Sequence, residues 1–140
     1  MKILLAVDGS TFTKRMLSYL AVHDEFLGGR QELTALTVVP PIAPRAHSQI
    51  AKEIVQDYYE WTAAEVFKPV QAFARQNGWQ LTCISQVGDA AVEIAKCAEE
   101  GDYDLICMGS HGHSAMAGVA LGSVVTKVLA RSRVPLLIIR

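Results

Sequence analysis

The stretch Asp104-Leu105-Ile106-Cys107-Met108-Gly109-Ser110-His111-Gly112, followed after nine residues by Gly122-Ser123-Val124-Val125, decides the fold of this chain. An apolar run enters a glycine turn, and a helical apolar pattern begins directly after Gly122-Ser123. Glycine lets a ligand approach the backbone closely. The first turn of a helix presents N–H groups without partners at the positive end of the helix dipole. Together these features predict an anion site, and phosphate is the usual ligand of such a site.

Composition indicates a single globular domain. The 140 residues are 51% hydrophobic, enough for one sizeable core, and 13 basic against 14 acidic side chains give a net charge of -1. A chain without a basic excess is not typical of a non-specific nucleic-acid binder, so we expect no nucleic-acid partner. No uncharged apolar run approaches the ~20 residues of a membrane helix, so we expect no membrane association. Cys83, Cys97 and Cys107 lie apart in apolar segments, which is typical of buried free thiols in a reducing cytoplasm.

Apolar runs alternate with helical patterns along the whole chain. Continuous apolar runs predict five strands that are buried on both faces, at residues 3–7, 33–39, 79–87, 103–108 and 134–139. Helical patterns predict the segments between them, at about 10–28, 50–73, 88–101 and from 122 onward, with a proline-rich loop at 40–48. This alternation predicts an α/β fold, a single-domain doubly wound five-stranded parallel sheet with helices on both faces.

The long predicted helix after the proline-rich loop contains two unusual features. Pro69 removes one helix hydrogen bond and clashes with the preceding turn, so we expect a kink or a break near Phe67 or Lys68. The aromatic residues Tyr58, Tyr59 and Trp61 are expected in the core or on its flank rather than in a ligand site.

Two of the predicted strands end in residues suited to ligand binding. The first ends at Asp8-Gly9-Ser10 and the fourth at Gly109-Ser110-His111-Gly112. Ligands of doubly wound sheets bind at the carboxyl ends of the strands, where the strand order reverses. If these two strands are neighbours, Asp8 can contact a ribose hydroxyl or a metal ion, and the glycine turn and the helix start at Ser123 can bind phosphates. Asp8 can also cap the first helix, and the two roles are compatible.

Residues that would mark a fast phosphotransferase are missing from the sequence. The GxxxxGK[ST] and GxGxxG patterns are both absent. Lys127 comes only one turn after Ser123, and no carboxylate follows Asp104 to act as a base.

Two alternatives for the glycine turn have weaker support. His111 and His113 could ligate a metal ion, but they lack a third ligand nearby in the sequence. A hydrolase triad of Ser110, His111 and Asp8 is the other alternative. Adjacent residues of a turn rarely point at each other, and no GxSxG elbow is present.

These residues resemble the universal stress protein family, in its nucleotide-binding branch, over nearly the whole chain. Residues 3–10, 36–40 and 134–140 resemble the first, second and last strands of that family. Gly109-x-x-Gly112, nine residues and then Gly122-Ser123 match the ATP-binding pattern of the family in every fixed position. The long spacing makes this match far more specific than GxxG alone.

The resemblance implies a Rossmann-like nucleotide-binding domain over residues 1–140, with strand order 3-2-1-4-5, ATP with Mg or Mn as ligand, and a homodimer. In that strand order residues 134–140 form an apolar sheet edge, so we expect the homodimer to form through the Val134–Arg140 strand. It implies that Asp8 lies near ribose and contacts the metal through the nucleotide phosphates. The main chain near Val38 and Val39 would meet adenine. The expected nucleotide-binding residues are Ala6, Asp8, Gly9, Ser10, Val38, Val39, Met108, Gly109, Ser110, His111, Gly112, Gly122, Ser123 and Val124.

Two positions depart from the family pattern. Members often carry basic residues just after the second glycine, whereas residues 115–120 have none and His113 stands where arginine is frequent. We therefore expect weaker attraction for phosphate. Thr37 also replaces a frequent histidine.

The predicted function is that of an ATP-binding regulatory module of the stress response, with little or no hydrolysis. The missing lysine and base favour this hypothesis over a slow ATPase or a phosphotransferase that acts on itself or a partner. The intact glycine spacing favours it over a nucleotide-free dimeric scaffold. The sequence identifies neither the stress nor the protein partner.

Overall fold

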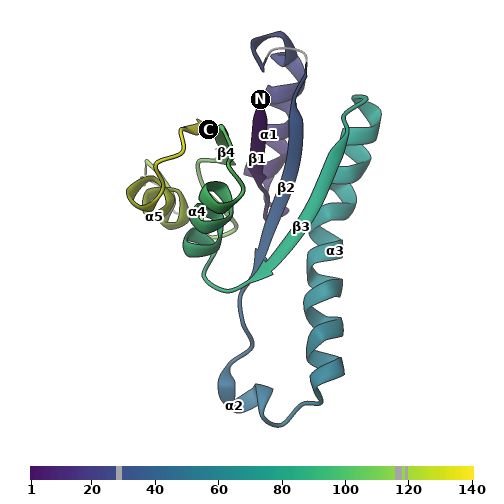
Figure 1. Cartoon of the computed structure of the whole chain (residues 1–140). Coiled ribbons are helices and arrows are strands. Elements are labelled where there is room, and N and C mark those ends of the chain that lie inside the picture. Colours follow the sequence, from purple (N-terminus) through teal and green to yellow (C-terminus); the bar gives the residue numbers. More distant parts are fainter. Residues whose placement is uncertain (28–29, 116–117, 119) are drawn as a thin grey trace.

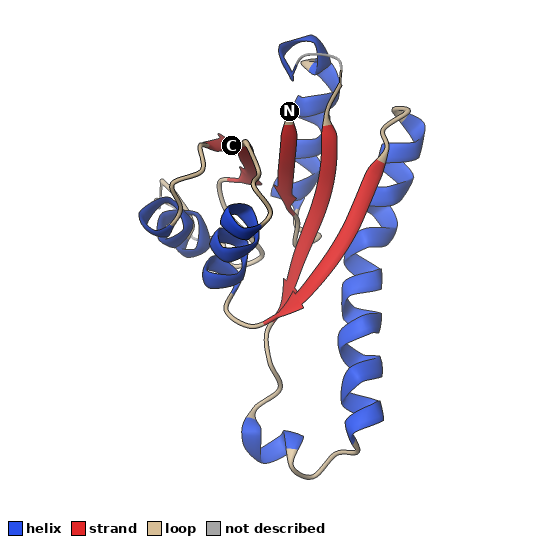
Figure 2. Ribbon diagram, viewed as in Figure 1, coloured by secondary structure: helices blue, strands red, loops and turns tan. Residues whose placement is uncertain are grey.

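A computed structural model describes residues 1–27, 30–115, 118 and 120–140. Its elements, in chain order, are β1 (Lys2–Ala6), α1 (Thr11–Val22), the 3-10 helix η1 (Asp24–Leu27), β2 (Glu32–Val39), α2 (Pro44–His47), α3 (Lys52–Gln76), β3 (Leu81–Val87), α4 (Ala90–Glu100), β4 (Leu105–Gly109), α5 (Ser123–Arg131) and β5 (Leu136–Ile139). The strands form one five-stranded sheet in the order β3-β2-β1-β4-β5, and every pair is parallel (Figures 1 and 2). The predicted fold class and strand order are confirmed.

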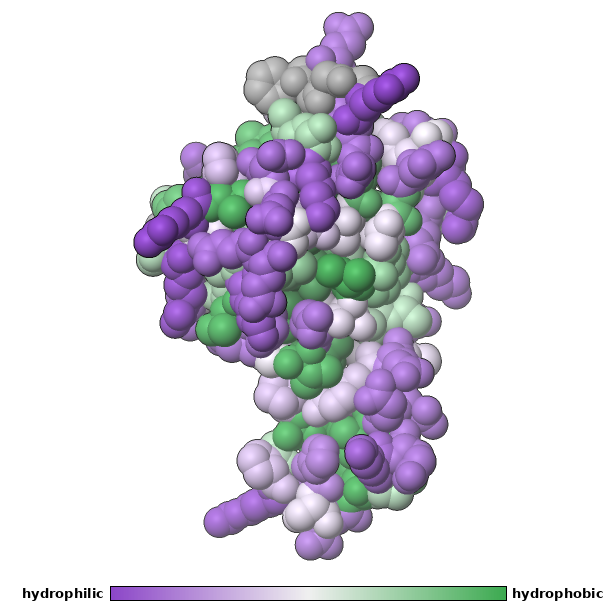
Figure 3. Space-filling model, viewed as in Figure 1, coloured by the Kyte–Doolittle hydropathy of each residue, from purple (hydrophilic) through white to green (hydrophobic). Residues whose placement is uncertain are grey.

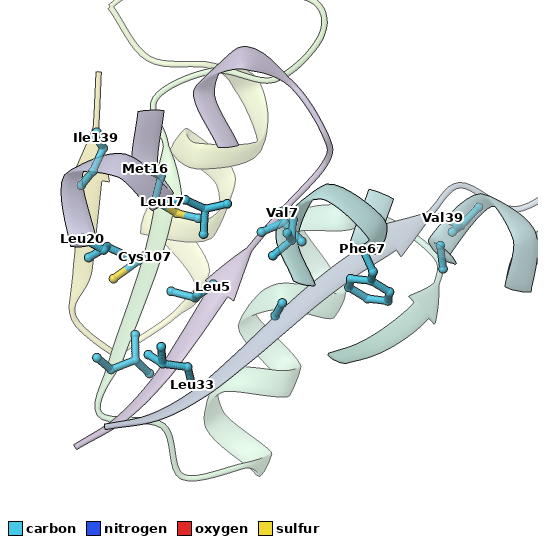
Figure 4. Packing of buried hydrophobic residues seen from close by; sticks show 14 residues of the cluster. Leu5, Val7, Met16, Leu17, Leu20, Leu33, Val39, Phe67, Cys107 and Ile139 are labelled. Atoms are coloured by element: carbon cyan, nitrogen blue, oxygen red, sulfur yellow. The ribbon is translucent and has the colours of Figure 1, made fainter. Parts of the chain in front are cut away.

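Each face of the sheet carries its own hydrophobic core. Ile3, Leu5 and Val7 alternate along β1 and its exit, and they pack with α1 and α3 on one face (Figure 4). Leu4 points to the other face and packs with α4 and α5. β1 is buried on both faces because it lies at the centre of the sheet, which explains its continuous apolar sequence.

Three strands begin two residues later than the apolar runs predict, at Leu81, Leu105 and Leu136. Helix exits account for two of the differences. The N–H of Trp79 donates to the carbonyl of Ala74 at 2.9 Å, and the N–H of Tyr103 donates to the carbonyl of Ala98 at 3.0 Å. These residues therefore still satisfy the last turns of α3 and α4 and cannot join the sheet ladder.

The break expected near Phe67 or Lys68 does not occur, because α3 is one continuous helix of 25 residues with Pro69 inside it. Proline removes the hydrogen bond to the carbonyl of Glu65. Pro69 and Glu65 are both exposed, so water can bind this carbonyl. Phe67 and Val70, on the buried side, hold the helix against the sheet. The loop predicted at 40–48 is also more ordered than expected, since α2 forms within it with Pro44 in its first turn.

The aromatic residues of α3 are more exposed than expected. Tyr58 and Trp61 are 46% and 63% exposed, so the expectation that they lie in the core or on its flank is wrong. Only Tyr59 is half-buried, and its hydroxyl accepts a hydrogen bond from the N–H of Ile42 at 2.9 Å.

The three cysteines are free thiols, as predicted, but only Cys107 is fully buried. Burial raises the pKa of the Cys107 thiol to about 12. Partial burial also raises the pKa of Cys83 and Cys97. A raised pKa keeps a thiol protonated and unreactive at neutral pH.

None of the helices in the described residues has both the length and the apolar sequence that a membrane span needs.

We predict that Pro69→Ala stabilises the protein, because it restores the helix hydrogen bond to Glu65. The gain should be about 1–2 kcal/mol, less than the ~3 kcal/mol difference in helix propensity, because proline also lowers the entropy of the unfolded chain. Urea denaturation measures this change. The neighbouring exposed control Lys68→Ala should stay within about 0.5 kcal/mol of the wild type. A Pro69→Ala variant less stable than the wild type would contradict this account of α3.

Candidate functional site

A cleft of about 650 Å³ opens where the carboxyl ends of β1 and β4 meet. These strands are neighbours, with Ala6 paired to Met108, so the cleft lies where the strand order reverses. The residues that line it are Ala6, Val7, Asp8, Thr13, Val38, Pro40, Ala90, Ile94, Met108, Gly109, His111, Gly112, His113, Ser114, Gly122, Ser123, Val124 and Val125.

One wall of the cleft is apolar. It is formed by the end of β2, the start of α4 and the middle of the sheet, through Val38, Pro40, Ala90, Ile94 and Met108. Ile94 and Met108 are both 5% exposed and belong to the core beneath the cleft, so this wall is fixed by packing. A wall of this kind suits a flat apolar ring.

The carboxylate of Asp8 is held by the start of α1. Its Oδ1 accepts hydrogen bonds from the N–H of Ser10 and the hydroxyl of Thr13, both at 2.9 Å. The same Thr13 hydroxyl accepts from the N–H of Asp8 at 3.1 Å. Oδ2 points toward the glycine turn, because a Cβ placed on Gly112 would lie 2.7 Å from it. Oδ1 therefore serves the loop at the start of α1, and Oδ2 faces across the cleft.

The glycines of the motif have different structural roles. A Cβ on Gly109 would lie 2.5 Å from the Cβ of Phe12, so Gly109 lets α1 pack against the end of β4. A Cβ on Gly122 would lie 3.2 Å from the carbonyl oxygen of Ser110. The N–H of Gly122 donates to that oxygen at 2.7 Å, so it is already used within the protein. Packing therefore requires Gly109, and a side chain at Gly122 would crowd the backbone of the glycine turn, whatever the cleft binds.

The first turn of α5 supplies backbone donors to the cleft. Gly122 occupies the N-cap, where no side-chain cap forms, and the first helical hydrogen bond runs from Thr126 to Gly122 at 3.1 Å. The N–H groups of Ser123, Val124 and Val125 precede this bond and have no acceptor within the helix. All three residues line the cleft. Their N–H groups and the helix dipole favour an anion at this end.

The two histidines of the turn contact its neighbours. Nδ1 of His111 lies 3.0 Å from the hydroxyl of Ser110, and its ring lies 5.2 Å from that of Phe12. Nε2 of His113 lies 2.6 Å from the backbone oxygen of Asp8, which makes His113 a donor to that carbonyl and ties the two sides of the cleft together.

The alternatives for this turn are not supported. Ser110 and His111 do point at each other, against expectation, but Ser110 is only 1% exposed and does not line the cleft, so it cannot serve as a nucleophile there. Throughout the described residues, no group of three or more His, Cys, Asp or Glu side chains could hold a metal ion. Asp8 is therefore the candidate metal contact, with other ligands coming from a bound molecule.

Most of the predicted site residues line the cleft, namely Ala6, Asp8, Val38, Met108, Gly109, His111, Gly112, Gly122, Ser123 and Val124. Four do not. Ser10 caps α1, and Gly9, with φ 77°, forms the turn between Asp8 and Ser10. Val39 is 3% exposed in the core on the opposite face of the sheet, and Ser110 is buried.

Further lining residues were not in the predicted set: Val7, Thr13, Pro40, Ala90, Ile94, His113, Ser114 and Val125. Pro40 and Ala90 follow strand ends closely, which is a signal that could have identified them. Thr13 and Ile94 lie within helices, and nothing in the local sequence marks them.

This arrangement defines a doubly wound α/β protein with a cleft at its topological switch point. The chain belongs to the universal stress protein family, whose model matches residues 1–140. Universal stress protein YxiE of Bacillus subtilis is 29% identical, over 99% of this chain and 98% of its own length.

Solved structures are similar over almost the whole chain. Protein MJ0577 of Methanocaldococcus jannaschii has a TM-score of 0.79 at 26% identity, covering 99% of this chain and 94% of its own. A universal stress protein in complex with cAMP has a TM-score of 0.75 at 20% identity, covering 100% of this chain and 97% of its own.

We predict that Thr13→Val destabilises the protein by at least about 2 kcal/mol, because a hydrogen bond to a charged group contributes about 1.5–3 kcal/mol. The variant loses the bond to Asp8 Oδ1 and leaves the N–H of Asp8 without its acceptor. The control Thr13→Ser keeps the hydroxyl and loses one buried methyl, which costs about 1 kcal/mol. Denaturant unfolding compares the two, and a valine variant as stable as the serine variant would refute this role of Thr13.

Proposed function

We propose that this protein is a regulatory nucleotide-binding module of the stress response, which binds ATP with Mg or Mn in the cleft and hydrolyses it little or not at all. The observation that carries the proposal is the presence, in one cleft, of an apolar wall and of a helix start whose first three N–H groups have no acceptor within the helix. Membership of the universal stress protein family supports the biological role. The cAMP complex of a protein with this fold supports an adenine nucleotide as the ligand class.

The cleft residues fit the parts of a nucleotide. A volume of about 650 Å³ lies within the range of small-molecule sites, about 300–1,000 Å³. In this proposal adenine lies on the apolar wall beside Val38, and the N–H groups of Ser123, Val124 and Val125 bind phosphate oxygens. Oδ2 of Asp8 accepts a hydrogen bond from a ribose hydroxyl or contacts the metal.

Charge determines how the phosphates are held. Among the described residues that line the cleft, Asp8 is the only Asp or Glu, and there is no Lys or Arg. The sequence also has no Lys or Arg between Leu105 and Thr126. A triphosphate would therefore meet N–H dipoles and one carboxylate, with no fixed cation. Mg²⁺ is commonly held by one or two carboxylates together with substrate phosphates, which matches a site with one carboxylate.

The same lack of charge argues for slow turnover. Phosphoryl transfer relies on positioned charge and on a residue that orients the nucleophile. The described lining residues include no lysine or arginine, and their only carboxylate, Asp8, is bonded to Ser10 and Thr13 through Oδ1. We expect turnover well below the ~10 s⁻¹ typical of enzymes. Three free thiols suit a reducing compartment, so we assign this function to the cytoplasm.

We further propose a homodimer through β5. This strand lies at the edge of the sheet, and its side chains Leu136, Leu137 and Ile138 are only partly buried. An apolar sheet edge is a template for pairing with another strand. A second copy related by a two-fold axis would add its own β5 in antiparallel orientation.

We predict that removing Mg²⁺ weakens ATP binding at least tenfold, whereas AMP binding changes less than about threefold. ATP carries the larger negative charge into a cleft without a fixed cation, so it depends more on the metal. Calorimetry with Mg²⁺ and then with EDTA measures both ligands on the same preparation. Equal ATP affinity with and without Mg²⁺ would refute the role given to the metal, and no binding of either nucleotide would refute the proposed function.

We predict that Ile138→Lys converts a dimer into a folded monomer, because it introduces a charge at the strand contact. Light scattering at tens of micromolar measures the mass, and circular dichroism verifies the fold. Leu129→Lys is the matched control, since Leu129 is 55% exposed on α5 and lies outside the proposed contact. A wild-type monomer, or a dimer unaffected by Ile138→Lys, would exclude this interface.

A further inference from the structure

The first half of α3 carries an apolar stripe on its outer side. Ile54, Tyr58 and Trp61 are 61%, 46% and 63% exposed. They are spaced at i, i+4 and i+7, which places them on one face of the helix. Large side chains this exposed, aligned over two turns, are typical of an interaction surface rather than of scattered surface residues.

The stripe lies directly opposite the side of α3 that packs against the protein. Val55, Ala63, Phe67 and Val70 are buried. Ala63 follows Ile54 by about two and a half helical turns, which places it on the reverse side of the helix. The exposed stripe is therefore not a loosely packed part of the core but a second apolar face of the same helix.

This part of α3 stands apart from the cleft. Together with α2 it forms a lobe that extends beyond the carboxyl ends of β2 and β3 (Figure 1). Hydrophobic surface is visible on this lobe, which a narrowing separates from the rest of the molecule (Figure 3). The hydroxyl of Tyr59 accepts from the N–H of Ile42 and fastens α3 to the segment before α2. None of the stripe residues lines the nucleotide cleft, so the inference is independent of the proposed function.

An acidic row runs beside the stripe. Glu53, Asp57 and Glu60 are exposed, and each immediately precedes one of the stripe residues. They repeat at i, i+4 and i+7 as well, so they form a parallel line along one edge of the stripe. Lys52 is the only basic residue from 50 to 67. The surface thus combines an apolar face with a negative edge.

The acidic row disfavours a second copy of this chain as the occupant. An antiparallel copy that keeps the contact apolar pairs Ile54 with Tyr58 of the copy. The acidic rows of the two helices then run along the same edge of the contact, which brings Asp57 close to Asp57 of the copy. Like charges in this position are destabilising. Shifting the copy by one heptad relieves the repulsion but sets Ile54 against Glu65, which buries a carboxylate without a partner.

We propose that this surface docks an amphipathic helix of another protein, about three turns long, with large apolar side chains on one face and Lys or Arg along one edge. Such a helix covers the stripe with its apolar face and places its cations against the acidic row.

A designed peptide tests this chemistry. The probe is a 14-residue helix with acetylated and amidated ends, leucines on one face and lysines along one edge, and its control carries glutamates in place of the lysines. Fluorescence anisotropy of the labelled peptides, added to the whole protein, should give at least tenfold tighter binding of the basic peptide. Binding should weaken as salt is raised.

Variants of exposed residues locate the contact without disturbing the fold. Trp61→Gln should weaken the basic peptide at least tenfold, whereas the matched control Leu129→Gln, also exposed but on α5, should bind as the wild type does. The double variant Asp57→Lys with Glu60→Lys should reverse the preference and favour the acidic peptide.

Three results would overturn the proposal. One is no saturable binding of the basic peptide, and another is equal affinity in Trp61→Gln and the wild type. The third is self-association, measured by light scattering, that Trp61→Gln abolishes and Ile138→Lys leaves intact, because a second copy would then occupy the stripe. None of these results bears on nucleotide binding, which calorimetry tests separately.

Discussion

The parallel pairing of β1 with β4 is the constraint on which the cleft depends. The register from Ile3–Leu105 to Ala6–Met108 brings two strand exits side by side, although about a hundred residues separate them in sequence. One exit delivers Asp8 and the other delivers the glycine turn. The Gly122 N–H then donates to Ser110 and fixes the start of α5 against that turn. Each contact is made by backbone or by short side chains, so the geometry tolerates little change in residue size.

Much of the fold and of the cleft could be predicted because local sequence patterns determine where strands and helices begin and end. Apolar runs such as 3–7 define buried strands, and Asp89 and Gly122 mark the starts of α4 and α5. The strand order came from resemblance to the universal stress protein family, and the sheet confirms it. Once two strand exits are known to be neighbours, the residues directly after them lie at the cleft by topology alone.

The remaining features depend on tertiary contacts that no local pattern encodes. Pro69 lies on the exposed side of α3, and only the packing of Phe67 and Val70 reveals that the helix survives it. Val39 adjoins Val38 in sequence but points to the opposite core, since strand side chains alternate. Gly122 is among the expected nucleotide-binding residues, but its N–H donates to the carbonyl of Ser110 and is used within the protein. Trp61 is exposed because α3 extends beyond the sheet.

The cleft and the outer side of α3 are therefore built from different kinds of chemical groups. The cleft is built from backbone groups, one carboxylate and an apolar wall, whereas the outer face of α3 is built from large apolar side chains and acids. This separation would let the proposed nucleotide binding and the proposed partner docking vary independently.

The central claim is that the β1 and β4 exits and the start of α5 together hold a nucleotide. Amide chemical shifts recorded by NMR during titration with MgATP test it most directly. The account predicts saturable shifts of the Asp8, Gly112, Ser123 and Val124 amides, while amides on the outer side of α3, such as that of Trp61, stay unchanged. Absence of saturable shifts at millimolar MgATP, or shifts confined to residues outside the cleft, would contradict it.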